Sequence, residues 1–209
     1  MTNQDEVTVL SGIRAGNFAG TLCDGQYGIH YVPSCDDVAP AKRLMHQPFD
    51  LQTILTRTGW RGLVILDTKS DFEILTRNAV AAGDLVLVVV KDLASLLQAE
   101  KVFRLLRDYG RRPTDARVVL SMVDRRIKYR ETENADVLAL LISEIRRRRY
   151  PLLESFLSHS PKVASLETNP SGNLLPVLVG APRSMIHQQL RQTAHDVLKL
   201  LDQLGLPEF

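Results

Sequence analysis

The sequence predicts an α/β fold with a mostly parallel sheet flanked by helices in three layers. Apolar runs rich in branched residues predict buried strands at residues 61–68, 84–90 and 117–124. Helical patterns separate these runs, and parallel neighbours need such long connections, which cross over with a right hand. The 209 residues, 44% of them hydrophobic, suit one domain over 1–209 with a substantial core.

The N-terminal part contains weaker signals. Residues 27–34 predict a short strand, and residues 41–59 predict a helical region that Pro48 interrupts. The glycine-rich stretch Ser11–Thr21 follows the apolar run 7–10 and is spaced like a phosphate loop. It has no lysine followed by Ser or Thr, so we interpret it as a surface loop eased by glycine.

The remaining helices have recognisable ends. Residues 71–83 have apolar residues at helical spacing, with Gly83 as the expected C-terminal cap. Asp92 is the expected N-cap of the next helix. Further helices are predicted at 135–150 and 184–204, and the last carries a broad apolar stripe that core packing explains.

Composition excludes several classes of protein. The formal net charge of +2 does not by itself indicate nucleic-acid binding. Cys23 and Cys35 form no disulfide framework, and neither cysteines nor histidines have metal-ligand spacing. The longest apolar run, 85–90, is far shorter than the roughly 20 residues that span a bilayer. We therefore expect a cytoplasmic protein that does not bind membranes.

The stretch LVILDTKSDFEILTRNAVAAGDLVLVVV, residues 63–90, resembles the middle of a ParA/MinD-type partitioning ATPase. In that family a Walker B strand ends in Asp, a helix contains LT-x-NA, and the next strand opens with Asp. A strand ending in Asp at 117–124, a Pro/Ser/Gly segment at 167–177 and APRS before the last helix follow in the same order. The resemblance covers Val7 to Leu204. It implies a P-loop NTPase fold without its first strand and phosphate loop.

The resemblance also implies where nucleotide would lie. Asp67 matches the Walker B aspartate that orients magnesium, and Asp124 and Pro170 match the nucleotide edge. The Walker A lysine loop has no counterpart, and phosphoryl transfer requires that cradle. We therefore expect no ATP hydrolysis, no catalytic or metal-ligating residue and no cofactor. ATP and magnesium would bind if a missing segment or an unrecognised site exists. Alternatively, Asp67 is a strand-end carboxylate that caps a turn.

Positive charge is concentrated in two runs, Arg125–Arg130 and Arg146–Arg149. ParA-like proteins hold non-specific DNA through scattered basic side chains that contact phosphates. The resemblance therefore suggests a DNA-binding set; its members are Arg125, Arg126, Lys128, Lys162 and Arg183. Alternatively, the arginines form a solvated face and pair with nearby glutamates such as Glu144 and Glu154.

Three hypotheses on function follow. The first is a non-hydrolysing ParA/MinD-like homodimer of DNA segregation or intracellular positioning that binds protein, DNA or both. The second is the larger part of an active, ATP-binding chromosome or plasmid partitioning ATPase. The third is an interaction module that docks onto a ParA-like or ParB-like partner. Loss of the family's first strand predicts a gap in the sheet, which the run 7–10, a second copy or a new strand order would fill.

Overall fold

The computed structural model describes residues 8–34, 39–69, 71–129, 135–167 and 176–205. The chain divides into two compact units, Met1–Asp84 and Leu85–Glu208. Each unit is described by itself, and the expected single domain stays a prediction.

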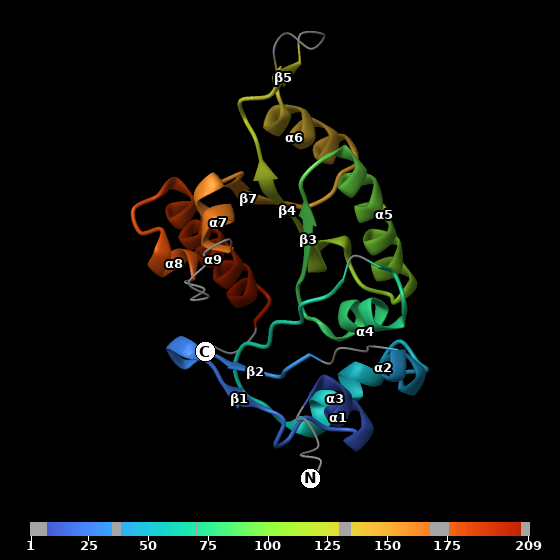
Figure 1. Ribbon diagram of the computed structural model, residues 1–209. Helices are drawn as coiled ribbons and strands as arrows, with labels where there is room; N and C mark the ends of the chain where they lie inside the picture. The colour runs from blue at the N-terminus through green and yellow to red at the C-terminus, as the bar shows by residue number, and fades with distance from the viewer. Residues whose placement is uncertain (1–7, 35–38, 70, 130–134, 168–175, 206–209) are drawn as a thin grey trace. The chain divides into compact units, whose positions relative to one another are not determined.

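The first unit is mainly helical (Figure 1). Its elements are α1 (Val9–Ala15), β1 (Cys23–Asp24), the 3-10 turn η1 (Gln26–Gly28), β2 (His30–Tyr31), α2 (Ala39–Leu44), α3 (Asp50–Thr58) and α4 (Ile74–Ala82). The predicted helical region 41–59 is confirmed, including the interruption around Pro48. The predicted strand 27–34 is reduced to the two residues of β2, which pair antiparallel with β1.

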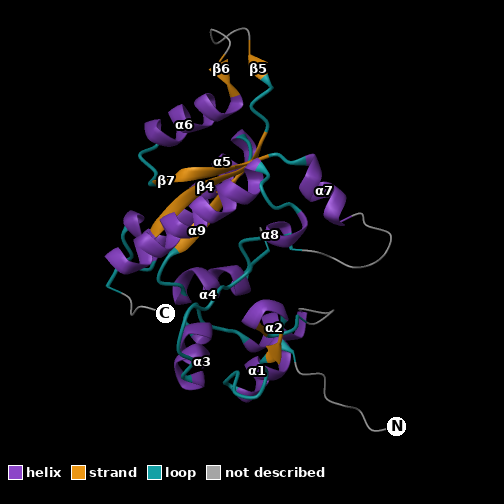
Figure 2. Ribbon diagram, turned by 90° about the vertical axis from the view of Figure 1, so that its left-hand side faces the viewer, coloured by secondary structure: helices purple, strands orange, loops and turns teal. Residues whose placement is uncertain are grey.

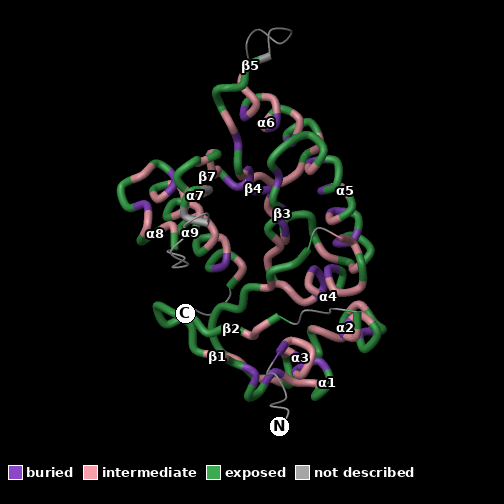
Figure 3. Tube along the Cα trace, viewed as in Figure 1, coloured by how far each residue is buried: buried purple, intermediate pink, exposed green. Residues whose placement is uncertain are grey.

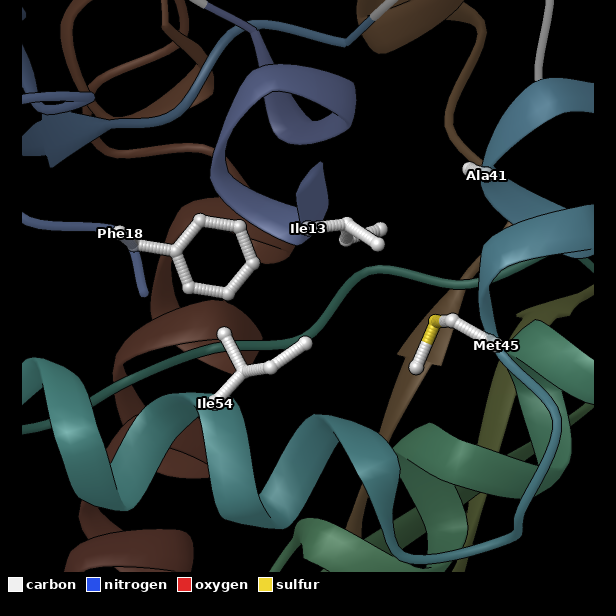
Figure 4. Packing of buried hydrophobic residues seen from close by; sticks show 5 residues of the cluster. All are labelled: Ile13, Phe18, Ala41, Met45 and Ile54. Carbon is white, nitrogen blue, oxygen red and sulfur yellow. The ribbon is translucent and has the colours of Figure 1, made fainter. Parts of the chain in front are cut away.

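A small hydrophobic core holds α1, α2 and α3 together (Figure 4). Its buried members are Ile13, Phe18, Ala41, Met45 and Ile54. The ring of Phe18 stacks on Trp60 with centroids 5.8 Å apart, and its backbone N–H donates to Thr58 Oγ1 at 2.8 Å. Burial of these apolar side chains supplies the main stabilisation of the unit.

The interpretation of Ser11–Thr21 as a surface loop is wrong for its first half. Thr8 caps α1 through a reciprocal pair of bonds with Ser11, so Val9 and Leu10 form the start of a helix. Gly12 lies inside this helix, and the position requires glycine because a Cβ there would approach the Phe18 ring to 2.1 Å. Gly16 ends the helix at φ 69°, a conformation that glycine adopts without strain.

The predicted strand 61–68 is also wrong. Leu63 to Asp67 belong to no strand or helix, and the side chain of Ile65 is 82% exposed. A strand forms when its backbone groups find a neighbour, and none of the described strands pairs with this run. The apolar composition of residues 61–68 predicted a strand, but no described strand pairs with this segment.

Asn78 of α4 joins two helices of the first unit. It is fully buried, and its Oδ1 accepts from the N–H of Leu51 at 2.9 Å in the first turn of α3. Its Nδ2 donates to the carbonyls of Gln47 at 2.9 Å and Ile74 at 3.0 Å. The side chain thus satisfies backbone groups that a helix end leaves free. Gly83 follows α4 as predicted, but with extended backbone at φ −77°.

The second unit is an α/β fold built on a three-stranded parallel sheet flanked by helices (Figure 2). Its elements are β3 (Val86–Val90), α5 (Leu93–Asp108), the 3-10 turn η2 (Pro113–Asp115), β4 (Ala116–Val123), β5 (Lys128–Tyr129), β6 (Ala135–Asp136), α6 (Val137–Arg147), β7 (Leu152–Ser158), α7 (Pro161–Glu167), α8 (Val177–Gly180) and α9 (Met185–Gln203). The strand order is β3-β4-β7. The predicted strands 84–90 and 117–124, their parallel pairing and the cap at Asp92 are confirmed.

β4 is the central strand of this sheet. Val118 and Leu120 on one face and Val119 on the other are all buried. Figure 3 shows buried positions along β4. α5 packs on β3 and α9 packs on β7, and Phe103 of α5 stacks on Tyr150 with centroids 4.1 Å apart. These helices shield the apolar faces that a parallel sheet requires to be covered.

We predict that Asn78→Leu destabilises the first unit. The substitution removes the partners of the Leu51 N–H and the Gln47 carbonyl, and each unsatisfied buried group costs about 1–3 kcal/mol. Urea denaturation should show a lower midpoint for Asn78→Leu. Gln52→Leu on the exposed side of α3 is the control and should unfold like the unmodified protein. An unchanged midpoint for Asn78→Leu would contradict the role of this side chain.

Candidate functional site

The predicted nucleotide residues are distributed over both units. Asp67 lies in the first unit, is exposed and follows the unpaired run Leu63–Leu66. Asp124 lies in the second unit at the carboxyl end of β4. Pro170 lies outside the described residues. The expectation that Asp67 ends a strand of the sheet is therefore wrong, while Asp124 does follow a strand as predicted.

Asp124 is held in a close ion pair with Arg126. Both carboxylate oxygens accept from the guanidinium: Oδ1 from Nε at 2.8 Å and Oδ2 from Nη2 at 2.6 Å. Oδ1 also accepts from the backbone N–H of Arg126 at 3.0 Å. These bonds favour the charged carboxylate and lower the pKa of Asp124 to about 2. The carboxylate is thus occupied by a neighbouring side chain.

Arg125 forms a second ion pair in the same loop. Its Nε donates to Asp136 Oδ2 at 3.1 Å. The other oxygen of Asp136 caps α6 by accepting from the N–H of Ala139 at 2.8 Å, and this bond and Arg125 both lower the pKa of Asp136. The basic loop after β4 therefore carries carboxylates that offset part of its positive charge.

The other proposed DNA contacts lie on different elements. Lys128 is on β5, Lys162 is on α7, and Arg183 precedes α9; all three are exposed. Arg183 has φ 63°, an uncommon conformation for a residue with a side chain. The structure does not gather the five predicted basic residues on one element.

The arginine run at the end of α6 pairs with acidic residues, as the solvated-face alternative predicts for Glu144. Glu144 accepts from Arg147 at 2.6 Å and from Arg148 at 2.8 Å. Hydrogen bonding by Arg147 is the main cause that lowers the pKa of Glu144 to about 2. Arg148 also lies 3.9 Å from Glu100 of α5. Two of the four consecutive arginines are thus engaged within the unit.

A groove of 390 Å³ in the first unit was not predicted from the sequence. It is lined by the apolar Ile13, Met45 and Ile54 and by the polar His46, Asp50 and Arg57, among others. Asp50 Oδ2 already accepts from the N–H groups of His46 at 2.7 Å and Gln47 at 2.8 Å. The groove contains none of the predicted site residues.

The open edge of β3 is a second feature; the sequence predicted a gap in the sheet but did not place it at β3. β3 pairs with β4 on one side, and no other described strand pairs with it. Val88 and Val90 are buried, whereas Leu87 is 41% exposed and Val89 is 62% exposed. The continuous apolar run VLVVV predicted a strand buried on both faces. Apolar and polar residues do not alternate along it, so nothing in the sequence indicated that one face is open. The strand thus offers an unpaired backbone edge and an uncovered apolar face.

No described helix is long and apolar enough to cross a membrane. Within the described ranges, no group of three or more His, Cys, Asp or Glu residues is placed to hold a metal ion.

Comparison with known proteins returns no family model and no curated protein that matches this chain. The ParA/MinD resemblance stays a prediction that rests on the motifs quoted above.

We predict that Arg126→Gln raises the pKa of Asp124 from about 2 toward its ordinary 3.8, because the two side-chain bonds are lost. NMR titration of the Asp124 carboxyl carbon measures this shift. A carboxyl whose folded pKa is lowered stabilises the fold above its unfolded pKa, and this contribution is lost as pH falls toward 2. Arg104→Gln, which removes a guanidinium paired with Glu100, should leave the Asp124 midpoint unchanged. An unchanged midpoint in Arg126→Gln would contradict the ion pair.

Proposed function

We propose that the protein is a non-hydrolysing relative of ParA/MinD ATPases that acts in DNA segregation or intracellular positioning by binding a protein partner. The open edge and uncovered face of β3 are the observation that carries this proposal. An edge strand with free N–H and C=O groups accepts an added strand, and neighbouring apolar side chains give the contact specificity.

The residues matched to the nucleotide site support binding over hydrolysis. The sequence has no G-x-x-x-x-G-K-[ST] loop to neutralise the outer phosphates. Asp124 is occupied by Arg126, and Asp67 does not follow a strand of the parallel sheet. A carboxylate alone repels phosphate, so neither residue supplies the positive cradle that phosphoryl transfer needs.

The charge distribution favours protein over DNA as the main partner. Arg125 and Arg126 each pair with a carboxylate, so DNA phosphates would have to compete with Asp136 and Asp124. Lys162 and Arg183 stay exposed and could contact phosphates. Strong duplex binding that weakens with rising salt and falls in Lys162→Ala would make DNA the main partner instead.

The open β3 edge also fits the second hypothesis, in which the chain is the larger part of an active partitioning ATPase. In that case a strand that carries the lysine loop would complete the sheet. Nucleotide binding separates this alternative from a binding function without hydrolysis.

We predict no saturable binding of a fluorescent ATP analogue with magnesium at millimolar concentration, because the lysine loop is missing from the sequence. Fluorescence titration of the unmodified protein and of Asp67→Ala should give the same flat response. Asp202→Ala in the solvent-exposed part of α9 serves as a matched charge control. Saturable binding that Asp67→Ala removes and Asp202→Ala retains would overturn the proposed function and favour the ATPase alternative.

A further inference from the structure

We propose that the run Leu63–Leu66 of one copy adds as a parallel strand to the β3 edge of a second copy, and that the exchange is reciprocal. This inference rests on the proposed function, because it uses the same edge of β3 and names its partner. Four observations on the chain support it: the acceptor edge, the donor run, their matching charges and the presence of both on every copy.

The acceptor is the edge of β3. Residues 85–90 carry no charge, and proteins commonly place charges or prolines on an edge strand to prevent association. Leu87 and Val89 leave an apolar face exposed beside the free backbone groups. Adding a strand there would satisfy the backbone and cover these side chains together.

The donor is the run Leu63–Leu66. All its side chains are apolar and two are β-branched, the composition of a strand buried on both faces. Leu63, Val64 and Ile65 are nevertheless exposed. The run is one residue shorter than β3, Val86–Val90, so it can pair along most of the strand.

Charges at the ends of the two segments are complementary in a parallel orientation. Arg61 precedes the donor run and Asp67 follows it, while Asp84 precedes β3 and Lys91 follows it. Parallel pairing places Arg61 near Asp84 and Asp67 near Lys91. In the same parallel register Lys69 lies near Asp92, so three pairs of opposite charge flank the paired segments.

Each copy carries both a donor run and an acceptor edge. A two-fold symmetric pair would therefore use both donors and both edges at once and close the assembly. This makes a second copy the occupant of the edge, since one interface removes both exposed features.

Sedimentation velocity of the full chain tests the dimer. Ile65→Asp places a charge at the centre of the donor run and should raise the dimer Kd by about tenfold or more, since burial of one isoleucine is lost. Ile29→Asp is the matched control, because Ile29 is also exposed and lies outside the run. A monomeric unmodified protein, or equal weakening by both substitutions, would overturn the inference.

Cross-linking identifies the strands that meet. Two differently tagged copies, with Cys23 and Cys35 replaced by serine, carry Ile65→Cys in one and Val89→Cys in the other. A short bismaleimide should join the two tags, whereas Leu178→Cys in place of Val89→Cys should not. Failure to join the two tags, together with an internal cross-link in a single chain that carries both Ile65→Cys and Val89→Cys, would mean pairing within one copy and overturn the exchange.

A charge exchange tests the orientation. Asp67→Lys or Lys91→Glu alone should weaken the dimer, and the double variant should restore it. Failure of rescue overturns the parallel pairing. A monomeric protein that does not bind nucleotide would overturn this inference and leave the proposed function standing. Asp67-dependent nucleotide binding would overturn the proposed function whatever the oligomeric state.

Discussion

Parallel pairing of β4 with both β3 and β7 is the interaction on which the second unit depends. β4 has a neighbouring strand on each side and buried residues on both faces, and its pairing with β7 shifts register between Val118 and Val123. α5 packs on β3 and α9 on β7, since apolar faces must be covered. The open side of β3 is the exception, because no described strand pairs with it there. Such an unpaired edge can accept a strand from a binding partner.

The electrostatics of the loop after β4 follow from hydrogen-bond geometry. Arg126 donates two side-chain hydrogen bonds to Asp124. Asp136 caps α6 and also accepts a hydrogen bond from Arg125. In sequence these residues form a basic cluster next to acids. In the structure Asp124 accepts hydrogen bonds from Arg126, and Asp136 accepts one from Arg125. These ion pairs therefore stabilise the segment that follows β4.

The LT-x-NA stretch that contributes to the ParA/MinD resemblance has a structural role here. Asn78 binds the start of α3, and Thr76 Oγ1 lies 3.2 Å from both the Lys69 carbonyl and Asp71 Oδ1. Polar residues that are buried and fully bonded fix how neighbouring segments pack. Such a motif can therefore serve packing without marking a reaction.

The sequence by itself determined part of the local structure. Helical spacing and caps placed α4, α5 and α9, and apolar runs placed β3 and β4, because these signals depend on neighbours along the chain. Tertiary structure alone decided that Leu63–Leu66 lacks a strand partner, that one face of β3 is open and that Arg126 occupies Asp124. Each of these depends on groups distant in sequence or on side-chain geometry, and an apolar run does not specify which neighbours it meets.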